Sequence, residues 1–385
     1  MSARTTPLRV CHVITGLETG GAERMLHKLA TRLDPERFHT VVVSLRERAA
    51  MAEPLERAGA EVHAAGLSLA RPSPRALARV GAMVRQARPH VVHGWMYHGN
   101  IAASLARMAR FTRAPVLWNV RASIDGFATM KPATVAAVKL GARLSRHPRR
   151  IVYNSREGAR QHEAIGYASG RATVIPNGFD CDAYAPQPAV GARVRAELGI
   201  PHDAIVLGQV ARYDPMKNQE GLVHAAAALR AGRDVHLLMA GRGVDARNER
   251  LAALVRELGL SDRVHLVGER GDVPALMAAL DVLVSPSNCL EGFPNAVGEA
   301  MASAVPCVVT DVGDAAWIVD DTGMVVPPWQ PEALADALRV MVALPAERRA
   351  ALGAAARERV RAHFSLETVT AAYEELYLAS ADACT

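Results

Sequence analysis

The stretch Val282-Leu-Val-Ser-Pro-Ser-Asn-Cys-Leu-Glu-Gly-Phe-Pro-Asn-Ala-Val-Gly-Glu-Ala-Met301 passes from a short apolar run, through a loop, into a helix that is expected to begin near Asn295. The run at 282–285 has the length of a buried strand and is too short for a buried helix. A strand followed directly by a helix is the repeating unit of parallel α/β proteins. This stretch therefore predicts a parallel sheet covered by helices.

The same rhythm runs along all 385 residues. Strand-sized apolar runs alternate with segments whose apolar residues recur every three or four positions, as in amphipathic helices. Further strands are expected at 10–14, 40–45, 91–93, 116–120, 151–153, 205–210, 235–239, 264–267 and 306–310. Helices are expected at 23–33, 75–87, 246–258 and 332–344, among others. The fold class that follows is α/β, with strands and crossover helices throughout.

The rhythm breaks at 175–188, where prolines, Asn177 and Gly178 cluster. Such a cluster is typical of a boundary between domains, and the chain length also suggests two of them. We therefore expect two Rossmann-like domains, 1–178 and 189–362, joined by a linker at 179–188. A last amphipathic helix within 363–385 need not belong to the second domain and is a candidate to cross back and pack on the first.

Composition narrows the class of protein. Half of the residues are hydrophobic and 22% are charged, as in a globular enzyme. No apolar run approaches the ~20 residues of a membrane span, and no apolar leader follows Met1, so a cytoplasmic protein is expected. The five cysteines form no Cys-x-x-Cys pair, which fits a reducing compartment, and they are assigned no chemistry.

Charge is distributed unevenly. Residues 1–180 carry 27 Lys/Arg against 12 Asp/Glu, whereas residues 181–385 carry 18 against 27. Between 66 and 150, fifteen basic residues accompany one acidic residue, Asp125. A basic half of this kind favours an anionic partner, either phospholipid or a phosphorylated acceptor. Peripheral association with the inner face of a membrane through this half is therefore an expectation.

Two cations follow the first strand expected in the second domain. The strand at 205–210 runs into Ala211-Arg-Tyr-Asp-Pro-Met-Lys-Asn218, so Arg212 and Lys217 stand just beyond its carboxyl end. Ligands of open α/β sheets bind at that edge. An arginine fork and a lysine point charge together suit a diphosphate. Because only four of the 45 basic residues are lysines, Lys217 is the more informative of the two.

A glycine-rich turn follows the first strand of the chain. It reads Ile14-Thr-Gly-Leu-Glu-Thr-Gly-Gly-Ala-Glu23, in which Gly20 and Gly21 allow the backbone to approach an anion at a helix amino terminus. Taken alone, the glycines also fit a tight strand-to-helix turn. Their spacing differs from the G-x-G-x-x-G of dinucleotide-binding proteins, which argues against a nicotinamide dehydrogenase.

Glu291 and Glu299 flank the start of the helix in the opening stretch. Backbone N–H groups at such a start, here from Gly292 to Val297, can face a phosphate or sugar hydroxyls. Each carboxylate can accept hydrogen bonds from vicinal hydroxyls, which both ribose and hexose offer. The alternative for Glu299 is that it only complements the helix dipole.

Together these motifs resemble the retaining glycosyltransferase family four, which has the GT-B fold. The resemblance rests on Glu-x7-Glu with its interior Gly-Phe-Pro-Asn, the Arg-x-Asp-Pro-x-Lys-Asn loop, the Gly-Gly-Ala-Glu turn and the Pro-Asn-Gly-Phe-Asp segment. It spans nearly the whole chain. It implies two Rossmann-like domains facing across a cleft, with 1–178 on the acceptor side and 189–362 binding the nucleotide-sugar.

The resemblance also implies roles for individual residues. Arg212 and Lys217 would hold the donor diphosphate, Glu299 the ribose and Glu291 the transferred sugar. Backbone near Gly271, Asp272 and Val273 would meet the base, and Gly20 and Gly21 would approach the diphosphate. The other positions expected on the donor side are Gly292, Phe293, Asn295, Ala296 and Val297.

No cofactor and no metal are implied, because the nucleotide-sugar is a substrate and cations with helix amino termini can neutralise the diphosphate. Asp180-Cys-Asp182 imitates the Asp-x-Asp metal motif of other glycosyltransferases, but it falls in the expected linker rather than after a central strand. We therefore expect no metal there.

The first domain departs from the family pattern. Many members carry a histidine in a Thr-x-His-like segment after the fourth or fifth strand, whereas this chain has Val116-Leu-Trp-Asn-Val-Arg-Ala-Ser123. Asn119 or Arg121 would occupy that region on the acceptor or sugar side. His98, or else His93, is the other candidate.

The predicted function is transfer of a sugar from a UDP- or GDP-sugar to an acceptor hydroxyl, in cell-envelope polysaccharide or glycolipid synthesis. The partners expected are the donor, a sugar-containing or lipid-linked acceptor and an anionic membrane, without nucleic acid. A nucleotide-sugar epimerase or phosphorylase of the same fold is the alternative enzyme. A cationic module that binds membrane or nucleic acid is the alternative from another class, and the low aromatic content of 4% counts against nucleic acid.

Overall fold

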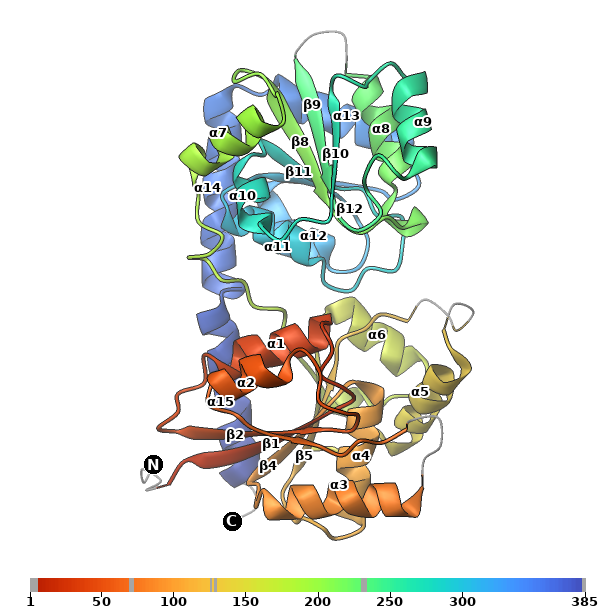
Figure 1. The fold of residues 1–385 in the computed structure, drawn as a ribbon, viewed down its shortest axis with the longest axis vertical. Helices are drawn as coiled ribbons and strands as arrows, with labels where there is room; N and C mark the ends of the chain where they lie inside the picture. The colour runs from red at the N-terminus through yellow and green to blue at the C-terminus, as the bar shows by residue number, and fades with distance from the viewer. Residues whose placement is uncertain (1–5, 69–72, 125–126, 128–129, 230–233, 383–385) are drawn as a thin grey trace. The chain divides into compact units, whose positions relative to one another are not determined.

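A computed structural model describes residues 6–68, 73–124, 127, 130–229 and 234–382. The chain divides into two compact units, Met1–Gly178 with Leu366–Thr385, and Phe179–Ser365. Figure 1 shows each unit as a sheet with helices on both faces. Within the described residues, no helix combines the length and apolar character needed to cross a bilayer.

The first unit is built on a parallel sheet whose central strands are almost fully buried. Its strands are β1 (Leu8–Ile14), β2 (Phe38–Ser44), β3 (Glu61–Ala64), β4 (Val91–Trp95), β5 (Val116–Val120), β6 (Arg150–Tyr153) and β7 (Ala172–Val174). Their order is β3-β2-β1-β4-β5-β6-β7, with Val10 opposite Val91 where β1 meets β4. All strands are parallel, but successive strands are added on one side of β1 up to β3 and on its other side from β4 onward. Open α/β sheets bind ligands at such a switch point, here between β1 and β4.

Helices cover both faces of this sheet. They are α1 (Gly21–Ala30), α2 (Ala52–Arg57), α3 (Pro74–Gln86), α4 (Met96–Met108), α5 (Pro132–Leu144), α6 (Arg156–Ala164) and α15 (Leu366–Asp382). Side chains of α1, α2 and α15 share one hydrophobic core with one face of the sheet, and α3 to α6 share a second core with the other face. Consecutive residues of β1, such as Val10 and Cys11, point into opposite cores, as the two-residue period of a strand requires.

The second unit repeats this plan. Its parallel strands are β8 (Ile205–Val210), β9 (Val235–Ala240), β10 (Val264–Gly268), β11 (Val282–Ser285), β12 (Cys307–Thr310) and β13 (Met324–Val326), in the order β10-β9-β8-β11-β12-β13. Val282 of β11 lies opposite Leu207 of β8. The switch point of this sheet is therefore between β8 and β11.

The helices of the second unit also form two layers. They are α7 (Pro188–Glu197), α8 (Gln219–Ala227), α9 (Glu249–Glu257), α10 (Val273–Ala278), α11 (Asn295–Ala302), α12 (Ala315–Val319), α13 (Pro331–Ala343) and α14 (Ala346–His363). Residues of α8, α9 and α13 bury one face of the sheet, and residues of α7, α10, α11, α12 and α14 bury the other. The α/β class and the two Rossmann-like units predicted from the sequence are confirmed.

The segment expected to be a linker, 179–188, lies within the second unit. Phe179 is 1% exposed and its ring stacks on Phe293 with centroids 6.0 Å apart. Its amide donates a 2.8 Å hydrogen bond to the carbonyl of Phe364. The chain therefore passes between units at Gly178, without a separate linker.

The last helix begins at Leu366 and is grouped with the first unit, whereas residue 363 still ends α14 of the second. A Cβ on Gly178 would come within 3.1 Å of the Leu366 Cα. The segments by which the chain leaves and re-enters the first unit therefore run close together. Tyr373 and Tyr377 of α15 are 0% exposed against the sheet.

Candidate active site

Loops that follow β8 and β11 line a cavity of about 260 Å³ in the second unit. Because these strands are neighbours and parallel, both loops emerge at the carboxyl edge of the sheet, at its switch point. The loop after β8 brings Arg212 and Lys217, and the loop after β11 brings Ser287 and Glu291. Residues far apart in the sequence thus surround one space.

Lys217 and Glu291 form an ion pair through Nζ and Oε1. The side chain of Glu291 is 10% exposed and that of Lys217 is 22% exposed, so water screens the pair less than at an open surface. Ser287 also donates a hydrogen bond of 2.8 Å to the same Glu291 oxygen. Glu291 is therefore held as an acceptor by two donors, before any ligand enters.

Arg212 is held mainly through its backbone. Its carbonyl accepts a 2.9 Å hydrogen bond from Gln219 Nε2, and its guanidinium donates to Asp214 at 2.8 Å while remaining 58% exposed. Asp214 in turn accepts from the Met216 amide at 3.1 Å and begins the turn that carries Lys217. The cation can therefore reach an incoming anion without moving the loop.

Gln209 is a cavity residue that the sequence patterns did not single out. It lies in β8, is 4% exposed, and its Nε2 donates to the Lys217 carbonyl at 2.7 Å. Among the residues described, its Oε1 has no hydrogen-bond partner, although a buried amide oxygen normally has one. The signal was a single amide in the otherwise apolar run Ile205–Val210. Ser287 was missed because nothing in the loop sequence marks it.

The start of α11 contributes Asn295 and Ala296 to the cavity. No side-chain cap is present on the described part of this terminus, where Pro294 is the preceding residue. Amides at an uncapped helix start favour an anion. The expectation for Val297 is corrected: its amide donates to the Pro294 carbonyl at 3.2 Å, so it is not a free donor.

Phe293 is among the residues that line the cavity, whereas Gly292 is not among the described ones that do. The Phe293 ring also packs in the core, with centroids 6.0 Å from Trp317 and 5.6 Å from Phe364, and so anchors the loop. The Gly292 carbonyl accepts from the Asp314 amide at 2.8 Å.

Glu299 lies in the second turn of α11 and is half-buried. It is not among the described residues that line the cavity, and neither are Gly271, Asp272 and Val273, which precede or begin α10. The Asp272 carboxylate accepts two hydrogen bonds from Arg270, at 2.8 and 2.7 Å, and these lower its pKa. The Asp272 carboxylate is thus paired within its own loop, although its side chain is 46% exposed.

In the first unit, Gly20 and Gly21 stand at the start of α1, after the carboxyl end of β1. A Cβ on Gly21 would meet no atom within 4 Å, whereas a Cβ on Gly20 would overlap Glu23 Oε2. His98 lies on α4, just after the carboxyl end of β4, and burial lowers its pKa. Both positions flank the switch point between β1 and β4.

Asn119 and Arg121 are held by hydrogen bonds within their own unit. Asn119 is 0% exposed and donates to the Tyr373 hydroxyl at 2.9 Å. Arg121 donates to the same hydroxyl at 3.2 Å and also to Asn177, and burial lowers its pKa. These bonds give Asn119 a structural role. The expectation that Asn119 contacts the acceptor is corrected, because its side chain is fully buried.

His93 is likewise corrected as a candidate contact for sugar or acceptor. It is 0% exposed in β4 and its Nδ1 lies 2.9 Å from the Tyr377 hydroxyl. Its ring packs against Trp95 with centroids 5.2 Å apart. Burial holds its pKa well below the ordinary value.

Asp180 closes a turn at the start of the second unit. Its Oδ1 accepts hydrogen bonds from the amides of Asp182 and Ala183 at 3.1 and 3.0 Å. The Asp-x-Asp pattern here is a local turn.

Two family models match the chain, one for each unit. The model for Glycosyltransferase Family 4 matches residues 19–183, and that for Glycosyl transferases group 1 matches residues 192–359. The first match includes the glycine-rich turn, and the second includes Arg212, Lys217, Glu291 and Glu299.

Curated relatives match parts of the chain. A D-inositol 3-phosphate glycosyltransferase of Kineococcus radiotolerans is 35% identical over 235 residues, which are 55% of this chain and 53% of the relative. The lipopolysaccharide core biosynthesis mannosyltransferase LpsB of Rhizobium meliloti is 29% identical over 285 residues, 68% of this chain and 79% of that protein. The chain spans about half or less of the length of the first relatives it matches.

Solved structures match the fold along nearly the whole chain. Anabaena HepE, in complex with UDP, superposes with a TM-score of 0.83 at 22% identity, covering 97% of this chain and 100% of HepE. WaaG, a glycosyltransferase involved in lipopolysaccharide biosynthesis, has a TM-score of 0.70 at 17% identity, covering 96% and 99%. The GT-B fold class predicted from the sequence is confirmed.

Proposed function

Because the chain belongs to glycosyltransferase family four, we propose that it transfers a sugar from a UDP- or GDP-sugar to an acceptor hydroxyl, with retention of configuration at the anomeric carbon. One observation carries the proposal: Arg212, Lys217, Glu291 and the uncapped start of α11 surround one cavity at the switch point of the second sheet. Cations and amides there suit a diphosphate, and a carboxylate suits sugar hydroxyls.

The donor diphosphate would take Lys217 and Arg212 as its counter-charges. The Lys217 ammonium already faces Glu291, so a bound phosphate would share it, and the exposed Arg212 fork would close on the phosphate oxygens. Such groups stabilise charge as it develops on the leaving phosphate, which is the largest catalytic term in many transferases. No bound metal is required by this scheme.

The reaction we propose is a front-face displacement. The bond from the anomeric carbon to the diphosphate oxygen breaks while the acceptor oxygen bonds to the same face of that carbon, and the acceptor proton passes to the departing phosphate. Glu291 would hold a hydroxyl of the transferred sugar rather than act as a nucleophile at the anomeric carbon, because Lys217 and Ser287 already bind its Oε1. Glu299, further along α11, would bind the ribose.

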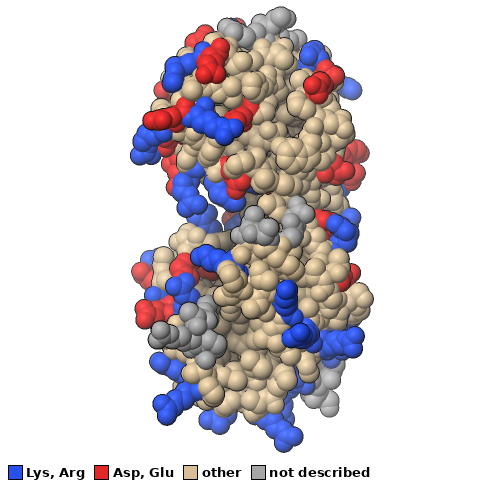
Figure 2. Space-filling model, turned by 90° about the vertical axis from the view of Figure 1, so that its right-hand side faces the viewer, with Lys and Arg blue, Asp and Glu red and all other residues tan. Residues whose placement is uncertain are grey.

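The acceptor we propose is a sugar-containing or lipid-linked molecule at a membrane surface. Two relatives act on such molecules by name, a lipopolysaccharide core mannosyltransferase and a galactosyltransferase of a diphosphoundecaprenol-linked sugar. The first unit is the basic one, and on the face seen in Figure 2 the blue side chains at its lower end have no red neighbours. Peripheral contact with anionic lipid would bring the enzyme to this acceptor.

A donor panel with defined variants tests the proposal. UDP-sugars come first because the HepE structure contains UDP, with GDP-sugars and an acceptor-free arm alongside. We expect Lys217→Ala and Arg212→Ala to lower turnover by about a hundredfold, as removal of other charge-stabilising groups does. The control is Arg247→Ala, whose side chain is 92% exposed and pairs with Asp245 in the same unit.

Three further readouts separate the parts of the proposal. Proton NMR of the first-formed product should show the anomeric configuration of the donor, and an inverted product contradicts retention. Activity should survive EDTA, and loss that Mg²⁺ restores contradicts metal independence. Glu299→Gln should raise the donor KM, whereas Glu291→Gln should lower kcat, and equal effects on both constants would contradict the division of roles.

A further inference from the structure

A second cavity lies at the end of the first sheet where the strands begin, opposite the carboxyl end that carries the glycine-rich turn. It has a volume of about 740 Å³ and is lined by residues of α4, of the loop that follows it and of the start of β5. Val116, the first residue of β5, forms part of its wall, whereas Arg121 follows the last. In a parallel sheet these two positions are on opposite edges, so this cavity is separate from the switch point between β1 and β4.

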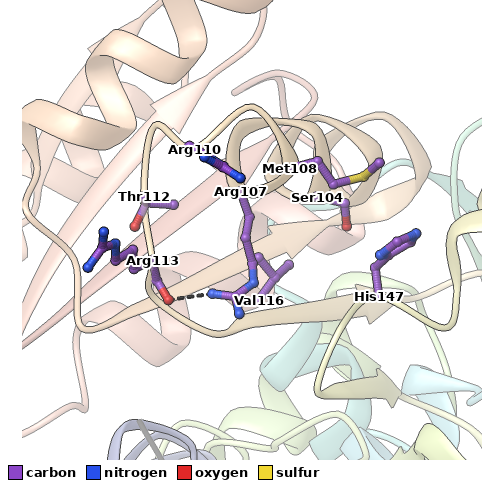
Figure 3. A pocket seen from close by; sticks show the side chains of 8 residues that line it. All are labelled: Ser104, Arg107, Met108, Arg110, Thr112, Arg113, Val116 and His147. Atoms are coloured by element: carbon purple, nitrogen blue, oxygen red, sulfur yellow. Dashed lines mark hydrogen bonds between the residues drawn. The ribbon is translucent and has the colours of Figure 1, made fainter. Parts of the chain in front are cut away.

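The cavity is lined by cations and hydroxyls. Figure 3 shows Arg107 and Arg110 at the end of α4, Arg113 in the loop, and His147 on the other side, with Ser104 and Thr112 between them. No acidic residue, Phe, Tyr or Trp is among the described residues that line it. A site of this composition favours an anion and offers no aromatic ring for base stacking.

The loop that shapes this cavity is fixed by hydrogen bonds. Arg107 donates to the carbonyls of Arg113 and Ala114, the latter at 2.8 Å, and Figure 3 shows the contact with Arg113. Thr112 Oγ1 accepts from the Ala114 amide at 3.1 Å. Arg110 adopts a left-handed φ of 61°, which turns the chain at the end of α4. The cavity is therefore pre-formed, and ligand binding need not order the loop.

The cavity arginines differ from those arginines of this unit that pair with carboxylates. Among the paired ones, Arg32 faces Glu367, Arg37 faces Glu374 and Arg48 faces Glu56, each at 2.8 Å. In the described part of the chain, no carboxylate lies within 4.0 Å of Arg107, Arg110 or Arg113. Between residues 97 and 156 the sequence itself holds only one acidic residue, Asp125. Three arginines thus line a pre-formed hollow that has no carboxylate among its described lining residues.

We propose that this cavity binds a phosphoryl group, carried either by an anionic phospholipid or by a soluble phosphate ester. One guanidinium group can donate two parallel hydrogen bonds to phosphate oxygens, and hydroxyls such as that of Thr112 can donate to the remaining oxygens. The site goes beyond the proposed transfer reaction, since it lies on the other edge of the sheet and uses none of the residues assigned to the donor.

The test uses the full chain and two probes. Inorganic pyrophosphate, followed by isothermal titration calorimetry with saturating UDP present to occupy the proposed donor site, represents the soluble source. Co-sedimentation with vesicles of phosphatidylglycerol and phosphatidylcholine, against vesicles of phosphatidylcholine alone, represents the lipid source. The variant is Arg110→Gln with Arg113→Gln, which leaves the loop-fixing Arg107 in place.

The matched control removes the same charge from paired arginines. Arg48 and Arg57 pair with Glu56 and Glu53 at 2.8 and 3.0 Å on or beside α2, so Arg48→Gln with Arg57→Gln changes net charge equally. We expect the cavity variant to bind at least one probe about tenfold more weakly, as loss of charged hydrogen bonds implies, and the control to stay within about twofold of the wild type. A fold check by circular dichroism accompanies both.

Each outcome decides the proposal. Loss of vesicle binding alone identifies a lipid headgroup, and loss of pyrophosphate binding alone identifies a soluble phosphate ester. Equal weakening by the control would mean that general charge attracts the probes, and the proposal is then wrong. It is also overturned if the wild type binds neither probe. Sugar transfer is assayed with a water-soluble acceptor, so failure of either proposal is seen separately.

Discussion

The Tyr373 hydroxyl of α15 accepts a hydrogen bond of 2.9 Å from the Asn119 side chain of β5, across 254 positions of sequence. Arg121 donates to the same hydroxyl at 3.2 Å. One phenol oxygen therefore serves two donors at the carboxyl end of β5, and it ties the last helix to the middle of the first sheet.

Replacing Tyr373 by Phe should loosen this attachment. The change leaves a buried amide without its acceptor and removes a partner of Arg121, and we expect a loss of about 2–3 kcal/mol in the stability of the first unit. Hydrogen exchange of residues 366–382 measures it, because fast exchange there reports opening of α15. Tyr213→Phe, which removes a hydroxyl contact with Glu220 in the second unit, is the control. Unchanged protection of α15 in Tyr373→Phe would contradict the role.

Gly313 should be irreplaceable because of the Glu291 loop. It has a left-handed φ of 60°, and a Cβ there would lie 2.6 Å from the carbonyl oxygens of Glu291 and Gly292. We expect Gly313→Ala to displace this loop and to lower donor affinity by at least about tenfold, beyond the ~1–2 kcal/mol that a left-handed alanine costs in stability.

Gly199→Ala is the matched control for Gly313. Gly199 has a φ of 68° in the same unit, but a Cβ there meets nothing within 4 Å. The control should therefore lose stability only. Donor titrations on both variants compare them, and equal affinity in the two would show that the backbone contact with Glu291 is unimportant.

Ser287 should matter for transfer more than for folding. Its hydroxyl donates to Glu291 Oε1 at 2.8 Å, so Ser287→Ala leaves the carboxylate with Lys217 as its remaining partner among these donors. A hydrogen bond to a charged group is worth about 1.5–3 kcal/mol, and we expect kcat to fall about tenfold or more with little change in the donor KM. Ser303→Ala removes a 3.0 Å bond to the Glu299 carbonyl and should leave kcat nearly unchanged. A kcat for Ser287→Ala equal to that of the control would refute the prediction.

The first unit should lose stability as the pH falls below about 6.5. Burial lowers the pKa of His12 to about 3 and that of His162 to about 4, and it holds the pKa of His93 well below 6.5. At pH values below about 6.5, these three histidines therefore bind protons in the unfolded chain but not in the folded unit. The stability contribution is complete above pH 6.5 and is lost as the pH falls toward 4 and 3.

Urea unfolding at pH 7.5 and 5.5 tests the pH dependence. Each of the three histidines should cost about 1.4 kcal/mol between these two values. His12→Asn should make the dependence shallower by one such step, whereas His202→Asn, at an exposed position of the second unit, should not. A His12→Asn protein with the full wild-type dependence would contradict the assignment to buried histidines.

The central strands could be predicted from the sequence, whereas among the edge strands β10 was predicted, at 264–267, and three others were not. Strands such as β8 and β11 bury both faces and so read as apolar runs. By contrast, β3, β7 and β13 lie at sheet edges and are only partly buried, so their residues carry no clear apolar signal.

For the site, loops could be predicted and partners could not. Arg212, Lys217 and Glu291 follow strand ends, and parallel strands deliver their ends to one edge, so their meeting follows from topology. That Phe293 turns into the core, that Val297 bonds to Pro294, and that Asn119 bonds to Tyr373 depends on contacts that spacing does not encode. The amide of Gln209 was visible in the sequence but had no motif to mark it.

The return of α15 to the first unit has a consequence for synthesis on the ribosome. Residues 366–382 are translated only after residues 6–178 of the first unit and residues 179–365 of the second. Until then, the apolar surface that Val369, Tyr373 and Tyr377 cover in the first unit stays open to solvent or to a chaperone. The unit that begins first is therefore the last to receive all of its chain.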